Sequence, residues 1–263
     1  MSGLNTALWG VFPYLVGCLL VAGTIWRWRY DQFGWTTRSS QLYESRLLRL
    51  GSPLFHFGIL VVVFGHAIGL VVPKRWTDAV GLSQEAYHLQ ALVLGGVAGA
   101  CTLVGIAILI YRRRRTDPVF LATTRNDRAM YLVLVAAIVA GLTTTLLDAG
   151  SAGGGHNYRL TVSLWFRSLF VLHPDVPAMS RAGLAFHVHV LIGLTLFACV
   201  PFTRLVHAFS APVGYLFRPY LVYRRREPAG SDAGRGSRGS WNRASREQPG
   251  APRAPRASRY VRR

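Results

Sequence analysis

The sequence predicts an all-α integral membrane protein, a bundle of five transmembrane helices followed by a disordered basic tail. Hydrophobic residues make up 51% of the 263 residues and charged residues only 16%, whereas soluble domains carry about 25% charged residues. The charge is concentrated: the net charge is +19, and residues 224–263 hold 12 arginines against 3 acidic residues. Five apolar stretches approach the length of a membrane-crossing helix, about 20 residues. This pattern excludes a soluble enzyme or a simple nucleic-acid-binding domain.

The five stretches lie at residues 8–26, 54–72, 88–111, 130–147 and 184–206. The first is not a cleavable signal peptide, because no basic segment precedes it and bulky residues follow it at 26–28. The second and fifth contain histidines, and the third ends in the run Arg112–Arg115. The fourth follows that basic loop, and Pro201 predicts a kink in the fifth. Between the fourth and fifth, Leu160–Val171 predicts a short interfacial helix.

Basic residues gather on one side of the predicted membrane. The loops 27–52 and 112–129 carry five and six arginines. The opposite side holds only five basic residues, namely Lys74, Arg75, Arg159, Arg167 and Arg181. Because basic loops stay in the cytoplasm, we expect the N-terminus outside and the C-terminus in the cytoplasm. The sequence therefore predicts a multi-pass protein of the cell inner (cytoplasmic) membrane.

The chain divides into a membrane domain at residues 1–223 and an Arg-rich tail at residues 224–263. The tail is rich in Arg, Ser, Gly, Pro and Ala, so it cannot bury enough apolar surface to fold. We expect the tail to be disordered and cytoplasmic. Its charge suits anionic membrane lipids or an acidic partner surface, unless it is a solvated extension without a specific role. No nucleic-acid partner is expected.

Histidines lie at membrane depth in two of the five spans. His56 and His66 lie on the second span, and His187, His189 and His207 lie on or at the end of the fifth. Ionisable side chains are costly in lipid and are usually kept for a purpose. The iron of a b-type haem takes two axial imidazoles, so two antiparallel helices with two histidines each can hold two haems. Alternatively, these histidines carry protons or only hydrogen-bond neighbouring helices, as in a transporter or a scaffold.

The topology pairs these histidines at two levels of the membrane. We expect His66 and His189 to bind iron near the outer face, and His56 and His207 to bind iron near the inner face. His189 and His207 are 18 residues apart, five complete helical turns, so they share one face. Their rise is about 27 Å against about 15 Å between His56 and His66, a difference that helix tilt and a kink must absorb. His187 points roughly 200° away from His189 and is expected to be a polar neighbour.

The residues around these histidines resemble a known family. Leu54-Phe55-His56-x-Gly58-Ile59-Leu60 and Gly65-His66-x-x-Gly69 resemble the second helix of the gamma subunit of respiratory nitrate reductase. In the fifth span, the matching strings are Phe186-x-x-His189-x-x-x-Gly193 and Pro201-Phe202-x-Arg204-Leu205-x-His207. The resemblance covers about residues 8–223 and leaves the tail unexplained.

The resemblance implies a membrane anchor and cytochrome b subunit that binds two b haems and oxidises quinol, either menaquinol or ubiquinol, near the outer haem. Electrons would pass inward to an iron–sulfur beta subunit and then to a molybdenum alpha subunit. Both partners would lie on the cytoplasmic side, where the alpha subunit reduces nitrate to nitrite for respiration or assimilation. A related dihaem subunit of a sulfur-compound or heterodisulfide reductase is the alternative.

Quinol oxidation also needs a proton acceptor beside the outer haem. Members of this family can have a lysine near the start of the third helix, where this sequence reads Glu85-Ala86-Tyr87-His88. We expect His88, with Tyr87, to accept the proton, because histidine exchanges protons readily near neutral pH; alternatively, His88 only faces water at the interface. Gly65 is expected to line the quinol site. Arg204 is expected to pair with a propionate of the inner haem, or to extend to the interface as a helix-end arginine.

Overall fold

A computed structural model describes residues 3–31, 43–150 and 157–210 of the chain, and the tail at 224–263 lies outside these ranges. All regular elements in the described ranges are helical. Five helices there are long and apolar enough to cross a membrane, which confirms the expected class: Gly3–Tyr30, Arg46–Val71, Gln84–Arg115, Arg125–Leu147 and Leu184–Phe202. The elements in chain order are α1 (Gly3–Thr6), η1 (Ala7–Val11), α2 (Phe12–Tyr30), α3 (Arg46–Val71), α4 (Lys74–Ala79), α5 (Gln84–Arg115), α6 (Asp117–Leu121), α7 (Arg125–Gly150), η3 (Tyr158–Leu160), α8 (Val162–Phe170), α9 (Val176–Ser180), α10 (Leu184–Cys199), η4 (Val200–Phe202) and η5 (Arg204–Ser210).

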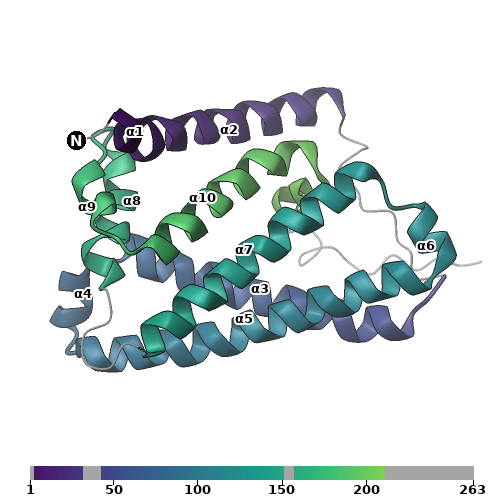
Figure 1. The fold of residues 1–263 in the computed structure, drawn as a ribbon, viewed down its shortest axis with the longest axis horizontal. Coiled ribbons are helices and arrows are strands. Elements are labelled where there is room, and N and C mark those ends of the chain that lie inside the picture. Colours follow the sequence, from purple (N-terminus) through teal and green to yellow (C-terminus); the bar gives the residue numbers. More distant parts are fainter. Residues whose placement is uncertain (1–2, 32–42, 151–156, 211–263) are drawn as a thin grey trace, which may run out of the picture. The chain divides into compact units, whose positions relative to one another are not determined.

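The long helices pack against particular neighbours. α3 lies along α5, α7 lies against both α5 and α10, and α10 lies against α2 (Figure 1). Glycines permit the close approach of α3 and α5: a Cβ at Gly58 would meet Thr102 Oγ1 at 2.6 Å, and a Cβ at Gly105 would meet the Cα of Phe55 at 2.7 Å. Small residues are the usual means by which membrane helices approach one another. Gly58 and Gly105 therefore allow the backbones of α3 and α5 to lie close together.

α3 and α5 extend beyond the predicted apolar stretches, because polar groups stabilise their ends. α3 begins well before residue 54, and the Glu44 carboxylate accepts a hydrogen bond from the Leu47 N–H at 2.7 Å at its start. α5 begins before residue 88, where the Ser83 hydroxyl accepts from the Ala86 N–H at 3.1 Å. At its other end, Arg112 is 2% exposed and its Nε lies 2.6 Å from the Glu44 carboxylate. This ion pair fastens the end of α5 to the start of α3.

The fifth helix ends earlier than the sequence predicts. α10 stops at Cys199, and residues 200–210 form the 3₁₀ segments η4 and η5. Pro201 explains the stop, because proline has no N–H to continue the helix and its ring crowds the preceding turn. His207 therefore lies on η5 and not on α10. The expectation of one continuous helical face for His189 and His207 is wrong.

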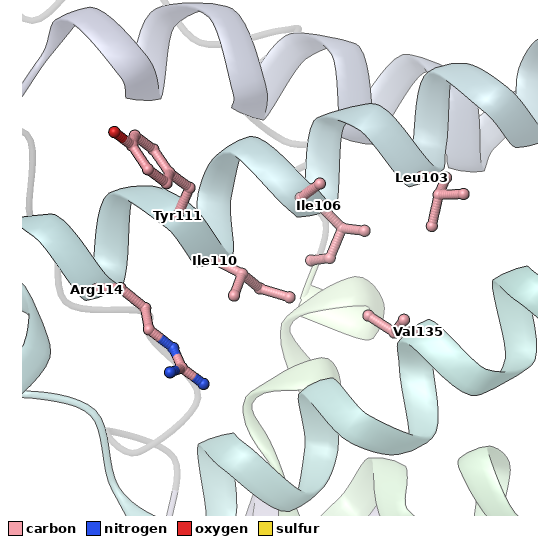
Figure 2. A pocket seen from close by; sticks show the side chains of 7 residues that line it. Leu103, Ile106, Ile110, Tyr111, Arg114 and Val135 are labelled. Atoms are coloured by element: carbon pink, nitrogen blue, oxygen red, sulfur yellow. The ribbon is translucent and has the colours of Figure 1, made fainter.

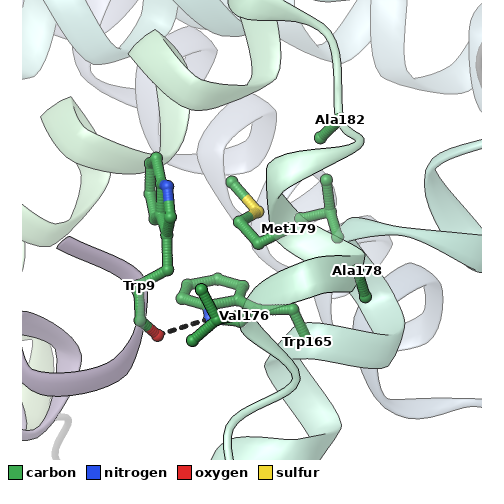
Figure 3. Close-up of a cluster of buried hydrophobic side chains, with 7 residues drawn as sticks. Trp9, Trp165, Val176, Ala178, Met179 and Ala182 are labelled. Atoms are coloured by element: carbon green, nitrogen blue, oxygen red, sulfur yellow. Dashed lines mark hydrogen bonds between the residues drawn. The ribbon is translucent and has the colours of Figure 1, made fainter. Parts of the chain in front are cut away.

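The short helix expected at residues 160–171 is α8, which covers Val162–Phe170. It packs with α9 and η1 around a buried cluster that includes Trp9, Trp165 and Met179 (Figure 3). The Trp165 indole N–H donates to the backbone carbonyl of Trp9 at 2.7 Å, the dashed line in Figure 3. These contacts attach α8 and α9 to the start of the first membrane helix.

The spans expose apolar side chains outward. On α3, for example, Phe57, Leu60 and Phe64 are 71%, 62% and 67% exposed. Water would make such a surface unfavourable, whereas lipid tails are as apolar as these side chains. Their backbone groups are paired within helices, as a lipid environment requires.

Candidate metal centres

Four histidine rings meet in two pairs, as the sequence predicts. The rings of His66 on α3 and His189 on α10 have their centroids 5.9 Å apart and are tilted by 48°. The rings of His56 on α3 and His207 on η5 have centroids 6.3 Å apart and an interplanar angle of 70°. In neither pair are the two rings stacked in parallel planes. Each pair brings together two segments that are more than 100 residues apart in the chain.

The separations suit one metal ion between the two rings of each pair. Two imidazole–metal bonds of about 2 Å each, plus about 1.1 Å from each ring nitrogen to its ring centre, give about 6 Å between centroids. The observed values of 5.9 and 6.3 Å match this span. Direct hydrogen bonding between two ring nitrogens at about 3 Å would bring the centroids closer than this in a linear arrangement.

The helices that carry the paired rings do not pack closely on each other. α3 packs along α5, whereas α10 packs on α7 and α2, with no comparable contact between α3 and α10. Residues 3–31, 43–150 and 157–210 contain no cluster of three or more His, Cys, Asp or Glu side chains suited to a metal ion. A two-imidazole donor set suits an iron that already has four macrocycle nitrogens. The described residues therefore fit a haem at each pair better than a bare ion.

Backbone carbonyls orient three of the four rings. The Nδ1 of His56 lies 2.7 Å from the Ser52 carbonyl, and the Nδ1 of His66 lies 2.8 Å from the Val62 carbonyl. The Nδ1 of His207 lies 2.5 Å from the carbonyl of Arg204. A carbonyl can only accept, so Nδ1 carries the proton and Nε2 keeps its lone pair for a metal. Such an outer hydrogen bond is the usual support of a metal-binding histidine.

His189 is supported differently, by a glycine on the neighbouring helix α7. Its Nδ1 is buried and makes no hydrogen bond of ordinary geometry, although the backbone of Ala137 lies within reach. A Cβ added at Gly141 would meet the His189 ring at Cε1 at 3.0 Å and at Nε2 at 3.5 Å. Gly141 therefore leaves the space that this imidazole occupies.

We call His56 and His207 the inner pair, and His66 and His189 the outer pair, after the depths expected from the sequence. The inner pair lies toward the end of the bundle that carries Arg27, Arg112–Arg115 and Arg204, which we call the basic end. Arg204 was expected to pair with a haem propionate. In the structure its Nε and Nη2 lie 2.6 Å from the two carboxylate oxygens of Asp127 on α7. This ion pair was not expected from the sequence. It already satisfies the forked face of the guanidinium that a haem propionate would need.

The residues expected at a quinol site lie at the opposite end, near the outer pair. Gly65 precedes His66, and a Cβ there would meet nothing within 4 Å. Tyr87 is only 8% exposed, its hydroxyl lies 3.2 Å from that of Tyr158, and the guanidinium carbon of Arg159 lies 4.1 Å from its ring centroid. His88 is half-buried beside it on α5. Tyr87 is thus part of a buried polar cluster, with His88 nearer the surface.

Comparison with known proteins identifies the family of the chain. The family described as nitrate reductase gamma subunit matches residues 5–226. The chain belongs to the nitrate reductase gamma subunit family.

Relatives of this family member come from several bacteria. It is 65% identical over 224 residues to the nitrate reductase-like protein NarX of Mycobacterium tuberculosis, which covers 85% of this chain and 34% of that protein. It is 41% identical over 226 residues to the nitrate reductase gamma chain of Bacillus subtilis, covering 86% of this chain and 100% of the relative. It is 34% identical over 224 residues to the respiratory nitrate reductase 2 gamma chain of Escherichia coli, covering 85% and 98%. The chain spans about a third of NarX and nearly all of the two gamma chains.

His187 of this gamma-subunit family member is a structural neighbour of the outer pair. Its ring stacks on Trp9, with centroids 5.0 Å apart, and its Nε2 lies 2.8 Å from the carbonyl of Met179. These contacts tie α10 to η1 and α9. The expected role of His187 as a polar neighbour agrees with this placement.

The sequence did not single out Tyr158, which lies beside the outer pair at the end of the bundle opposite the basic end. Its hydroxyl would be 3.0 Å from a Cβ on Gly69, one turn beyond His66, and its ring stacks on Phe186, one turn before His189. Tyr158 therefore bridges α3 and α10 next to the two outer imidazoles. Its position directly before Arg159, in a connection otherwise rich in glycine, was the signal available in the sequence.

Cations surround this polar cluster. Arg159 is 2% exposed and donates to the Thr77 hydroxyl at 3.0 Å. Arg167 on α8 donates to the Leu70 carbonyl at 3.1 Å. Burial, and then the nearby charges of Arg159 and Arg75, lower the pKa of Arg167. One guanidinium therefore lies over the Tyr87 ring, and another contacts the end of α3.

A pocket of about 420 Å³ lies between α5 and α7 toward the basic end (Figure 2). Five aliphatic side chains line it, with Tyr111 and Arg114 at one end. None of the four paired histidines lines this pocket. It is therefore separate from the candidate metal centres.

Proposed function

We propose that this chain is the membrane cytochrome b subunit of a nitrate reductase, which oxidises quinol at one membrane face and delivers electrons toward the other. The proposal rests on the two pairs of imidazole rings. The rings of each pair are spaced for a single iron, and the segments that carry them do not pack closely on each other. The gamma-chain relatives support the nitrate reductase assignment.

His66 and His189 would hold the outer haem and His56 and His207 the inner haem, each through Nε2. A b haem held in this way supplies reversible one-electron transfer, so two of them at different depths connect the two membrane faces. The protein contributes the spacing and the orientation of the four rings. The backbone carbonyls behind His56, His66 and His207 favour the tautomer in which Nδ1 carries the proton.

Quinol would bind beside the outer pair at the opposite end of the bundle. The open space at Gly65 leaves room for a flat ring next to His66. Tyr87 and His88 are the proposed proton acceptors. Tyr87 would take a quinol proton while its own hydroxyl proton passes to the Tyr158 hydroxyl, which it reaches, and the half-buried His88 adjoins Tyr87 toward the surface. The neighbouring Arg159 guanidinium favours any negative charge that develops on the phenol as a proton leaves.

We propose that the basic end faces the cytoplasm, because arginines concentrate there and basic loops stay inside. An iron–sulfur beta subunit and a molybdenum alpha subunit would then dock at this end, and residues 224–263 would extend on the same side toward acidic protein or lipid surfaces. Quinol protons would be released outside while electrons move inward. Moving a charge against a membrane potential stores about 2.3 kcal/mol per 100 mV.

The proposal is tested by haem content and by single histidine variants in the intact complex. A pyridine-haemochrome assay should give two b haems per chain. His66→Ala and His189→Ala should each remove the same haem and stop quinol oxidation, whereas His56→Ala and His207→Ala should each remove the other haem and leave one that quinol still reduces. Absence of b-type absorbance, or loss of the same haem in all four variants, would refute the assignment.

The partner assignment needs a separate measurement. Nitrite formation with a quinol donor by the purified complex supports the nitrate reductase role. Quinol oxidation that proceeds only with a sulfur-compound or heterodisulfide acceptor would refute it and leave the haem assignment standing.

A further inference from the structure

The segment that carries His207 is irregular, unlike the segments that carry the other three paired histidines. His56, His66 and His189 lie inside long α-helices, where neighbouring turns fix the backbone. His207 lies on η5, after the helix has stopped at Pro201, and 3₁₀ geometry is less well hydrogen-bonded than an α-helix. Something outside the segment must therefore fix where this ring points.

Side chains from two other helices hold the segment by its backbone. Arg27 on α2 donates from one nitrogen to the carbonyls of Pro201 and Thr203, at 2.8 and 2.9 Å. Asn126 on α7 donates to the Phe202 carbonyl at 2.6 Å. These are three consecutive carbonyls just after the end of α10, where the regular α-helical pattern has stopped. The start of the irregular segment is thus fixed from both sides.

The part nearest His207 is held by one ion pair. Both carboxylate oxygens of Asp127 accept from Arg204, at 2.6 Å each, and the side chains are 8% and 27% exposed. Two-pronged pairs of this kind fix geometry as well as charge. The carbonyl of the same Arg204 lies 2.5 Å from the Nδ1 of His207. Arg204 therefore connects Asp127 to the ring within a single residue.

Asp127 is itself held in place. Its carboxylate accepts from the Thr124 N–H at 3.0 Å, and its own N–H donates to the Thr124 hydroxyl at 3.1 Å. This reciprocal pair caps the start of α7 in the manner of a capping box. The carboxylate is consequently fixed relative to a membrane helix, and not to a loose loop.

We infer that Asp127, acting through Arg204, is a positioning residue for the inner haem ligand His207. The inference rests on the proposed haem function and deepens it: the angle of the His207 imidazole is set through an ion pair to α7, whereas His56 and His66 hydrogen-bond to carbonyls of their own helix. Neither side chain touches the iron. Both determine the orientation of the ring that does.

The test uses the intact haem-loaded complex with Asp127→Asn, Arg204→Gln, the double variant and Arg204→Lys. The EPR signal of a low-spin ferric haem depends on the angle between its axial imidazole planes, so it reports ring orientation directly. Asp117→Asn is the matched control, because Asp117 is an exposed carboxylate at the same end of the bundle and makes no ion pair or hydrogen bond with the described residues. Haem content and the midpoint potential of each haem are measured alongside.

Positioning and simple charge effects predict different outcomes. Charge alone should raise the midpoint potential in Asp127→Asn and lower it in Arg204→Gln. Each shift should change the ferrous-to-ferric ratio at a fixed potential by about threefold to tenfold, and the two shifts should cancel in the double variant. Positioning displaces or broadens the inner-haem EPR signal in the same way in both single variants and in the double. Arg204→Lys should show the same displacement, because lysine keeps the charge and loses the fork. The outer-haem signal and the Asp117→Asn control should stay unchanged.

The inference fails if the inner-haem signal is unchanged in Asp127→Asn and Arg204→Lys while His207→Ala still loses the inner haem. If His207→Ala keeps both haems, the proposed function itself fails, and the inference fails with it. The two failures are therefore distinguished by the same set of samples.

Discussion

Gly141 offers the sharpest test of how the outer imidazole is packed. Replacing it by alanine places a Cβ 3.0 Å from Cε1 of His189, where ordinary contacts lie at 3.4–4 Å. The ring must therefore shift by a few tenths of an ångström, or α7 must move away from α10. The rings of His66 and His189 are already spaced for two metal bonds at 5.9 Å, so a shift of this size strains one bond.

Overpacking of this kind costs about 1–3 kcal/mol. If the whole cost falls on haem binding, the affinity of the outer site drops by a factor of about 5 to 150. We expect Gly141→Ala to lower outer-haem content or to shift its reduced-minus-oxidised spectrum, with the inner haem unaffected. Gly141→Val should have a larger effect, because it fills more of the same space.

The assay is the haem content and difference spectrum of the complex in membranes. Gly96→Ala is the matched control, since a Cβ there meets nothing within 4 Å. Alanine in place of an unhindered helical glycine should be neutral or stabilising by up to about 1 kcal/mol. A Gly141→Val complex with two haems of unchanged spectrum and unchanged quinol reduction would refute the packing argument.

Three further predictions concern other contacts. Burial alone would raise the pKa of Glu44, but hydrogen bonds from the backbone and from Arg112 outweigh it and lower its pKa below the usual 4.5. The ionised carboxylate therefore stabilises the fold above that value, and this stabilisation is lost as the pH falls through the lowered pKa. On acidification below about pH 4.5, the melting temperature of the wild type should fall more than that of Glu44→Gln. Trp165→Phe removes a buried hydrogen bond to the Trp9 carbonyl and should cost about 1–3 kcal/mol, seen as a lower melting temperature; an unchanged value would contradict it. Tyr158→Phe should slow quinol oxidation and alter its pH profile at unchanged haem content, and a wild-type profile would count against a proton role for the phenol pair.

Sequence reasoning reached the helices and the paired histidines for a physical reason. Lipid tolerates few ionisable side chains, so a histidine at membrane depth stands out within its own segment, and the order of spans determines which histidines share a level. Those properties are local or topological. They required no knowledge of how the side chains pack.

The remaining features depend on contacts between distant segments. Asp127 and Arg204 are 77 residues apart, and nothing near either one marks it as a partner. Gly141 is one of many glycines, and only the ring beside it shows which of them matters. The sequence predicts a kink at Pro201, but whether a proline bends or ends a membrane helix depends on whether neighbours such as Arg27 donate hydrogen bonds to the carbonyls beyond it.

The regularity of α3 has a consequence for the speed of electron transfer. His56 and His66 lie on one helix with no proline between them, and Gly58 lies against α5 within that interval. In the proposed arrangement, ten residues of uniform rise place the two α3 ligands about 15 Å apart along the helix, which fixes one side of each haem site. Tunnelling slows exponentially with distance, so the rate depends strongly on this spacing. One residue inserted between His56 and His66 would instead turn one ring by about 100° and interrupt the route altogether.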